Sequence, residues 1–445
     1  MMDVPPFGPT RRRGQETIPM TRSLQPIAID GAEPIFTSPP PGPLHGVLEI
    51  GQAEADAVNH VLQRKTMFRF LNKPEVSESA HLEARYREMT GQPYALAIGG
   101  GGTGSLICGL VGLGIGSGDE VIVPGYTYIA TAAACLSVGA IPILAEIDQS
   151  LTLDPADVER KITEHTRAII PVHMRGSVAN MDAVMEIADR YGIAVLEDVA
   201  QANGATFHGH WAGAIGHAGA FSLQHYKLIT ASEGGLLITA DEQVYKRAAI
   251  KHDSAMQFWA DDATWPAFAG ENYRMCELRA ALALAQLDRL PGILERTRPV
   301  KAALLERTRH LDRLSQQTLH CAEGDCGITF ALFARSTEAA QQFSEALAAE
   351  GLPNATIYNH QIPDRHIYRA WDYVLEKRTS DPTGWPWTAA PRKIEYDPGM
   401  LPQTLDVLGR CVAIAINQQW QDEHVDLAVR AITRVHDALA ERGLL

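Results

Sequence analysis

Short apolar runs alternate with amphipathic segments along most of the chain. The apolar runs, rich in Ile, Val, Leu and Ala, cover residues 95–98, 120–124, 141–146, 168–172, 194–196, 218–223 and 236–239. Helical periodicity covers residues 103–113, 129–138, 155–164 and 180–191. Strands without a polar face, separated by helices, are typical of βαβ units around a buried sheet. The pattern therefore predicts an α/β fold with a mostly parallel central sheet flanked by helices.

The regions on either side of this alternation have other patterns. Residues 1–50 are dense in Pro and Gly and show no period, so we expect an N-terminal arm that is extended or disordered. Helical periodicity at 51–65 and 77–90 opens a large domain that we expect to span residues 51–300. Residues 301–445 mix strand and helix and predict a smaller C-terminal α/β domain. Within it, residues 364–400 are expected to form a long irregular loop.

Composition and charge exclude several classes of protein. The 445 residues include 39 basic and 53 acidic side chains, a formal charge of −14, which argues against nucleic-acid binding. No apolar run approaches the roughly 18 residues that span a bilayer, and no apolar stretch follows Arg11–Arg13 as in a secretory signal. The six cysteines form no Cys-x-x-Cys pair. We expect a cytoplasmic protein with reduced thiols and without membrane or nucleic-acid partners.

A glycine run at residues 99–105 lies between an expected strand and an expected helix. Such a run lets the backbone turn sharply, and the N–H groups at the helix start can hold a phosphate. The run also fits the dinucleotide pattern Gly-x-Gly-x-x-Gly, which wants an acidic residue at the end of the next strand. Here Asp119 and Glu120 precede that strand, which weakens this alternative. A tight turn without a ligand stays open.

Two further polar stretches follow strands. Asp198 comes directly after residues 194–196, and Lys227 lies between two apolar strands, five residues beyond Ser222 at a strand end. Each alone is commonly an ion pair, a helix cap or a surface residue. A phosphate cup, a carboxylate and a lysine, in this order and each after its own strand, are together what pyridoxal 5′-phosphate requires. The phosphate would be anchored, the ring nitrogen paired with the carboxylate, and the aldehyde held by the lysine.

Four ordered motifs carry a resemblance to a known family. They are Gly102-Thr103-Gly104-Ser105-Leu106, Glu197 to Gly204, Phe221 to Gly235, and Gly270 to Glu277. The chain resembles the DegT–StrS family of sugar aminotransferases, in the aspartate-aminotransferase-like superfamily, over about residues 51–300. The resemblance implies a PLP-transferase fold of type I, with a large PLP-binding domain over residues 51–300.

The resemblance also implies roles for particular residues. Lys227 should form the Schiff base with pyridoxal 5′-phosphate and carry the proton, and Asp198 should pair with the pyridine nitrogen. The other positions carried over are Gly102, Thr103 and Ser222 for the phosphate, Gln201 for the ring 3-oxygen, Tyr128 for the ring face, and Asn272 for the phosphate of the neighbouring subunit. The role of Asn272 implies a homodimer with shared active sites. The longer glycine run and Ser232 in place of the family's glycine are departures from the pattern.

The implied activity is transfer of an amino group from L-glutamine or L-glutamate to a keto-cyclitol or keto-sugar, in amino-sugar or aminocyclitol natural-product biosynthesis. Residues 171–182 favour the keto-cyclitol branch. A 3-amino-5-hydroxybenzoate synthase-like enzyme and a nucleotide-sugar aminotransferase remain alternatives, the latter because Arg175, Arg365 and Arg392 are available for a diphosphate. A regulatory PLP-binding protein without turnover is a further alternative. The loose histidine group at 208, 210, 217 and 225 is not expected to bind a metal.

Overall fold

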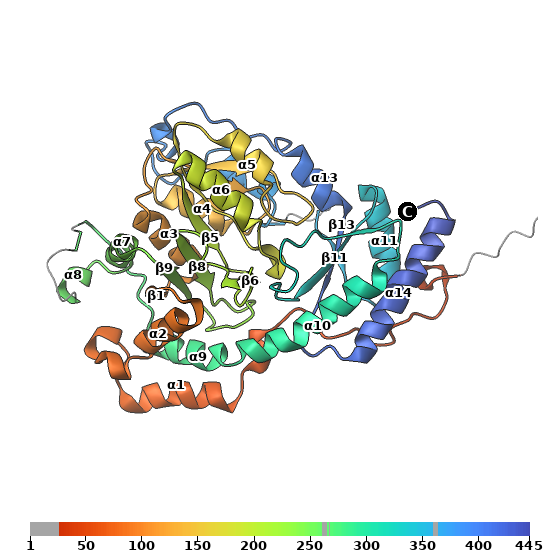
Figure 1. Ribbon diagram of the computed structural model, residues 1–445, viewed down its shortest axis with the longest axis horizontal. Helices are drawn as coiled ribbons and strands as arrows, with labels where there is room; N and C mark the ends of the chain where they lie inside the picture. Colours follow the sequence, from red (N-terminus) through yellow and green to blue (C-terminus); the bar gives the residue numbers. More distant parts are fainter. Residues whose placement is uncertain (1–25, 260–264, 267, 359–363) are drawn as a thin grey trace, which may run out of the picture.

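The computed structural model describes residues 26–259, 265–266, 268–358 and 364–445 (Figure 1). Its centre is a seven-stranded sheet in the order β1-β9-β8-β5-β4-β2-β3. The strands are β1 (Tyr94–Ile98), β9 (Gly235–Thr239), β8 (Ala218–Ser222), β5 (Ala194–Asp198), β4 (Thr166–Ile169), β2 (Glu120–Pro124) and β3 (Ile141–Ala145). Only β9 runs against its neighbours, β1 and β8, and the other pairs are parallel. This confirms the predicted mostly parallel sheet.

Each strand buries both of its faces, which explains why the strands lack a polar side. Successive residues point to opposite faces of a strand. Leu96 and Ile98 therefore join one apolar cluster, while Ala95 and Ala97 join another. The first face is covered by α3 (Gly101–Gly112), α4 (Ala130–Ser137) and α7 (Glu242–His252). The second is covered by α2 (Glu78–Thr90), α5 (Pro155–Lys161), α6 (Met181–Tyr191) and α9 (Glu277–Leu287).

The C-terminal part is built on a second, antiparallel sheet in the order β10-β11-β13-β12. Its strands are β10 (Ser315–Gln316), β11 (Thr329–Phe333), β13 (Cys411–Ala415) and β12 (Ala355–Thr356), and its main helices are α11 (Thr337–Ala349), α13 (Pro402–Arg410) and α14 (Asp422–Glu441). The first turns of helix α10 (Leu290–Thr308) pack into the core of the large domain, for example through Ile293, and its last turns pack into the core of the small domain, for example through Leu304. We therefore keep 51–300 and 301–445 as a proposed division with α10 shared between the two.

Residues 364–400 leave the small domain and return to the large sheet. They form short helical turns, including α12 (Asp372–Leu375). Tyr368 and Trp371 are wholly buried and belong to the same apolar cluster as the strand residue Leu96. The expected irregular loop thus has a packed base on the large domain.

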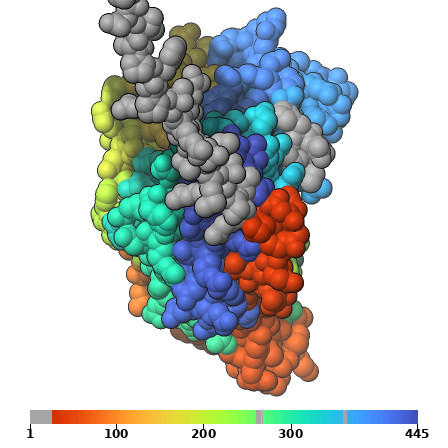
Figure 2. All heavy atoms as spheres, turned by 90° about the vertical axis from the view of Figure 1, so that its right-hand side faces the viewer, coloured from red at the N-terminus to blue at the C-terminus, as the bar shows by residue number. Residues whose placement is uncertain are grey.

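The N-terminal arm is described from residue 26, and residues 1–25 lie outside the described part. Residues 26–50, which we call the strap, contain two short 3₁₀ turns and run along the small domain before α1 (Gln52–Arg64). Ile27 and Phe36 are buried in the small domain's core. Figure 2 shows the beginning of the strap, in red, beside the deep-blue C-terminal helix α14. Among the described residues, no helix is both long and apolar enough to cross a membrane.

Candidate functional site

A cavity of about 950 Å³ opens where β5 and β8 end and α3 begins. Ligand sites in open α/β sheets lie at this carboxyl end of the strands. Seven of the eight residues predicted for cofactor binding or catalysis line the cavity: Gly102, Thr103, Tyr128, Asp198, Gln201, Ser222 and Lys227. They come from four stretches of the chain, so the fold brings together residues that lie up to 125 positions apart.

The glycine run leads into α3, which begins at Gly101, two residues earlier than expected, so that the later glycines form its first turn. The first N–H groups of a helix have no partner within it and carry the positive end of the helix dipole, so they can bind an anion. Those of Gly102 and Thr103 belong to this turn, and both residues line the cavity. A Cβ on Gly102 would lie 3.0 Å from the Cβ of Ser222. A glycine therefore lets α3 start directly against the end of β8.

Adjacent carboxylates at the end of β5 serve different faces of the sheet. Asp198 lies on the α3 side, where its oxygens accept hydrogen bonds from the Thr131 hydroxyl at 2.9 Å and the Ala200 N–H at 3.0 Å. Burial raises the pKa of Asp198, and these hydrogen bonds oppose that rise. Glu197 lies on the other face, wholly buried. It accepts three backbone N–H bonds and contacts the His173 ring at 3.0 Å. Of these two adjacent carboxylates, Asp198 is therefore the one available to a molecule in the cavity.

The amine of Lys227 is open to the cavity. Within the described part of the chain it has neither a hydrogen bond nor an ion pair. Burial lowers the pKa of Lys227, and the charges of Asp198 and Glu233 oppose that shift. An amine with a lowered pKa is deprotonated more readily, and the deprotonated amine is the form that attacks a carbonyl.

Several lining residues were not predicted from the sequence. Thr131, which bonds Asp198, lies in the first turn of α4, three residues after Tyr128, which precedes the helix. His366 comes from a remote segment. Its ring lies 5.5 Å from that of Tyr128, and its Nδ1 lies 2.8 Å from an oxygen of Asp364. No local pattern marks His366, because its segment reaches the site through an isolated β-bridge between Tyr126 and Ile367, which lie far apart in the sequence and outside the strands.

Other predicted residues lie elsewhere. Asn272 is exposed and outside the cavity of its own chain, so its role toward a neighbouring subunit stays a prediction. Of the three arginines considered for a diphosphate, Arg365 lines the cavity. Arg392 forks onto the buried Glu120, and Arg175 donates from Nε to the Tyr126 hydroxyl at 2.6 Å. Only Arg365 of the three is placed to meet a ligand in this cavity.

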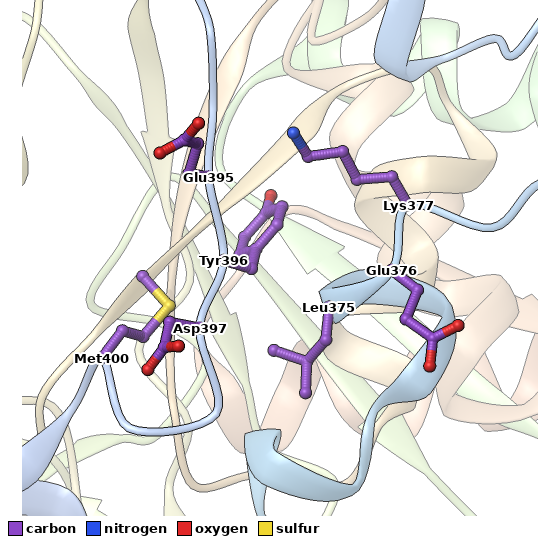
Figure 3. Close-up of a pocket in the computed structure, with 7 residues that line it drawn as sticks. All are labelled: Leu375, Glu376, Lys377, Glu395, Tyr396, Asp397 and Met400. Atoms are coloured by element: carbon purple, nitrogen blue, oxygen red, sulfur yellow. The ribbon is translucent and has the colours of Figure 1, made fainter.

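Two other groups of polar side chains lie away from the cavity. Figure 3 shows a pocket of about 510 Å³ lined by Glu376, Glu395 and Asp397 with Lys377, within the 364–400 segment. Its lining has no counterpart of the glycine turn or of the unpaired lysine. His208 does not meet the other histidines of its stretch but lies near Cys321 and Glu323, where the three ligand atoms are within 4.8 Å of one another. The expectation that the protein uses no metal stays a prediction.

The cavity fits pyridoxal 5′-phosphate by the chemistry of its donors. It offers a helix start and a hydroxyl for a phosphate, a buried carboxylate for a protonated ring nitrogen, and an unpaired amine for an aldehyde. Gln201 and Tyr128 add neutral polar groups to the wall, which also contains Asp364, Arg365 and His366. Glu233 also lines the cavity, and one of its carboxylate oxygens lies 3.6 Å from the position that a Cβ on Gly101 would take. Its negative charge would oppose a phosphate here, and the N–H groups at the start of α3 would have to offset it.

Comparisons with known proteins agree with this geometry. The sequence profile of the DegT/DnrJ/EryC1/StrS aminotransferase family matches residues 49–383. An L-glutamine:2-deoxy-scyllo-inosose aminotransferase of Micromonospora echinospora is 33% identical over 363 residues, 76% of this chain and 83% of that protein. The GDP-perosamine synthase of Caulobacter vibrioides is 39% identical over 209 residues, 47% of this chain and 56% of that protein.

Solved structures agree as well. The crystal structure of 3-amino-5-hydroxybenzoic acid synthase matches with a TM-score of 0.70 and 26% identity over 88% of this chain and 97% of its own. An aminotransferase from Psychrobacter cryohalolentis matches with the same TM-score and identity over 86% and 96%. The predicted resemblance is confirmed, and the chain belongs to the DegT/DnrJ/EryC1/StrS aminotransferase family.

Proposed function

We propose that the protein is a pyridoxal 5′-phosphate-dependent aminotransferase that moves an amino group from L-glutamine or L-glutamate to a keto-cyclitol. The observation that carries this proposal is the amine of Lys227, which has no partner among the described residues and shares one cavity with the buried Asp198 and the first turn of α3. The setting would be the biosynthesis of an aminocyclitol natural product, in the cytoplasm and as a homodimer with shared sites.

The residues of the cavity would divide the work as follows. The cofactor supplies an aldehyde that condenses with amines and a ring that stabilises a carbanion. Gly102, Thr103 and Ser222 would hold its phosphate, Gln201 its 3-oxygen, Tyr128 its ring face, and Asp198 its ring nitrogen. Lys227 would hold its aldehyde and, once released, accept and return a proton at Nζ, a role favoured by its lowered pKa.

The choice of acceptor is supported by relatives with a cyclitol substrate. Besides the Micromonospora protein, an L-glutamine:scyllo-inosose aminotransferase of Streptomyces griseus is 40% identical over 228 residues, 49% of this chain and 53% of that protein. The cavity wall adds hydrogen-bonding side chains suited to a ring with several hydroxyl groups, among them Thr356, Asp364 and His366. A second candidate, transfer to a nucleotide-linked keto-sugar, is favoured by Arg365 in the wall and by the GDP-perosamine synthase match.

An absorbance spectrum tests the proposal. The purified protein, loaded with pyridoxal 5′-phosphate, should show the visible band of a lysine-bound cofactor, and L-glutamine or L-glutamate should bleach it. Lys227→Ala should lack the band. A protein that takes up no cofactor would refute the assignment, and a band that no amino donor bleaches would indicate a binding protein without turnover.

The acceptor is tested in a second half-reaction. After the donor is removed, scyllo-inosose or 2-deoxy-scyllo-inosose should restore the visible band, and a nucleotide-linked keto-sugar should not. The reverse result would favour the second candidate. Arg365→Gln separates the two further, because loss of this guanidinium should weaken a diphosphate substrate much more than an uncharged cyclitol.

A further inference from the structure

The strap ends against the loop that carries Lys227. Gly46 is buried, and its N–H donates a hydrogen bond of 3.3 Å to the carbonyl oxygen of Lys227. The contact joins residues 181 positions apart in the sequence. We call residues 224–231 the lysine loop.

The lysine loop is neither helix nor strand. Two local hydrogen bonds fix its two ends. The Lys227 N–H donates to the Gln224 carbonyl at 3.0 Å, and the Ala231 N–H donates to the carbonyl of Leu223, just before the loop, at 2.8 Å. Contacts from outside hold the middle. Leu228 and Ile229 are buried in the apolar cluster of the large domain. Two hydrogen bonds add to this packing: that of Gly46, and that of the wholly buried Gln286, whose Oε1 accepts from the Thr230 N–H at 3.2 Å. A side chain whose reactive atom must be placed within about 0.5 Å depends on such supports.

The small domain fixes the strap. Asn417 donates to the carbonyl of Gly42 at 2.8 Å and also to that of Leu44. The Trp420 indole donates to the Pro41 carbonyl at 3.1 Å, and Gln418 donates to the His45 carbonyl at 3.1 Å. These bonds hold the strap over the five residues before Gly46, so the place of Gly46 is set by the small domain.

There is no room for a side chain at Gly46. A Cβ there would lie 2.8 Å from the Ile229 Cα and from Gln286 Oε1, and 2.9 Å from the Thr230 backbone nitrogen. Two of these atoms are lysine-loop backbone, so an added methyl group must push the loop and the strap apart. At Gly42, four residues earlier in the same strap, a Cβ would meet no atom within 4 Å. The chain thus offers a matched pair of positions, one tight and one open.

We propose that the strap is the positioning element of Lys227. Gly46 ties the backbone of the lysine to the small domain and so fixes the point from which its amine acts. The proposal deepens the proposed function and rests on the role given there to Lys227. It also gives residues 26–50 a purpose in the reaction beyond covering the surface.

The test compares Gly46→Ala with Gly42→Ala. Hydrogen–deuterium exchange of peptides covering 224–231 is measured on the cofactor-free protein, so this readout does not depend on turnover. Gly46→Ala should raise exchange in the lysine loop at least about tenfold, because local opening becomes easier. In the loaded enzyme, kcat should fall about 100-fold, as for a group misplaced by about 1 Å, while KM for the amino donor stays within about threefold. Gly42→Ala should match the wild type in both measurements.

Several results would overturn the proposal. They are unchanged exchange in the lysine loop of Gly46→Ala, an effect on KM alone, or equal effects of the two alanine variants. If Gly46→Ala does not fold, Asn417→Ala replaces it, because this change frees the strap far from the lysine. In this variant, exchange in the lysine loop should rise and kcat should fall, each by about five- to tenfold. Unaltered exchange in the lysine loop would refute the proposal. If the wild type forms no visible band, the role of Lys227 has failed, whereas the exchange data still decide whether the strap holds the loop.

Discussion

Two lysines below the surface show how the same side chain can be used in opposite ways. Lys301 lies between the domains, where its amine is 2.7 Å from an oxygen of Asp325 and 3.4 Å from the Ser177 hydroxyl. Lys227 faces the cavity and has neither kind of partner among the described residues. An ion pair removes much of the cost of burying a charge, and burial without a partner lowers the pKa instead. Lys301 is therefore a structural charge and Lys227 a reactive amine.

Removing Lys227 should abolish activity and leave stability intact. Lys227→Ala should reduce amino transfer by at least about 10⁴-fold, because one amine holds the cofactor and moves the proton. The melting temperature of the cofactor-free protein should stay the same or rise, because an unpaired amine no longer has to be buried. Calorimetry and a coupled assay check the two parts. A large loss of stability in this variant would contradict the contrast with Lys301.

Removing Lys301 should reduce stability and leave the activity of the folded protein intact. Lys301→Ala leaves the buried Asp325 without its cationic partner, with only the Ser177 hydroxyl and the Gly327 N–H still donating to it, which should cost about 3–5 kcal/mol in the free energy of unfolding. Replacing both partners, as in Lys301→Met with Asp325→Leu, should recover most of that loss. Denaturant unfolding measures both variants. Turnover per folded molecule should remain near the wild-type value, and a selective loss of turnover would show that Lys301 also serves the site.

The neighbouring carboxylates sharpen the same distinction. Asp198→Asn should reduce turnover about 100-fold with little change in stability, because a neutral amide cannot keep a ring nitrogen protonated. Glu197→Gln should cost about 1–3 kcal/mol of stability, because its amide group cannot accept all the backbone N–H bonds that the carboxylate accepts. Unfolding and kinetic measurements on both variants check that one change lowers turnover and the other lowers stability. Similar losses of turnover in both variants would argue against separate roles for the two faces of β5.

The smallest effect is expected at Glu233. Its charge raises the pKa of Lys227, against the lowering caused by burial. In Glu233→Gln the pKa of Lys227 should fall, so a larger share of the amine is deprotonated at neutral pH. The rate at which the cofactor-free protein takes up pyridoxal 5′-phosphate should then reach its plateau at a lower pH. Glu306→Gln, at an exposed side chain paired with Arg309, is the control and should leave the profile in place. A shift to higher pH would contradict the sign.

The sequence predicts well the features that repeat along the chain or stand at strand ends. Strands buried on both faces leave a clear apolar signal, and the residues that follow them meet at one edge of the sheet, as Asp198 and Lys227 do. It is harder to predict which residues of a strand point to which face of the sheet. Nothing local shows that Asp198 rather than Glu197 faces α3. Contacts between remote segments are harder still, because Gly46 at Lys227 and His366 at Tyr128 leave no period to read. Helix α10 shows the same limit, since its continuous periodicity hides the passage from one core to another.

The strap also has a consequence for the order in which the protein matures. Residue 46 is synthesised before the lysine that it supports, residue 227, and the anchors Asn417 and Trp420 are synthesised after both. A nascent chain that has left the ribosome as far as α9 contains every predicted cofactor ligand but lacks the groups that fix the strap. We therefore expect the lysine to be held in place only after residues 417–420 have been made and the strap has docked on them, so that a chain that stops before them reacts poorly with the cofactor.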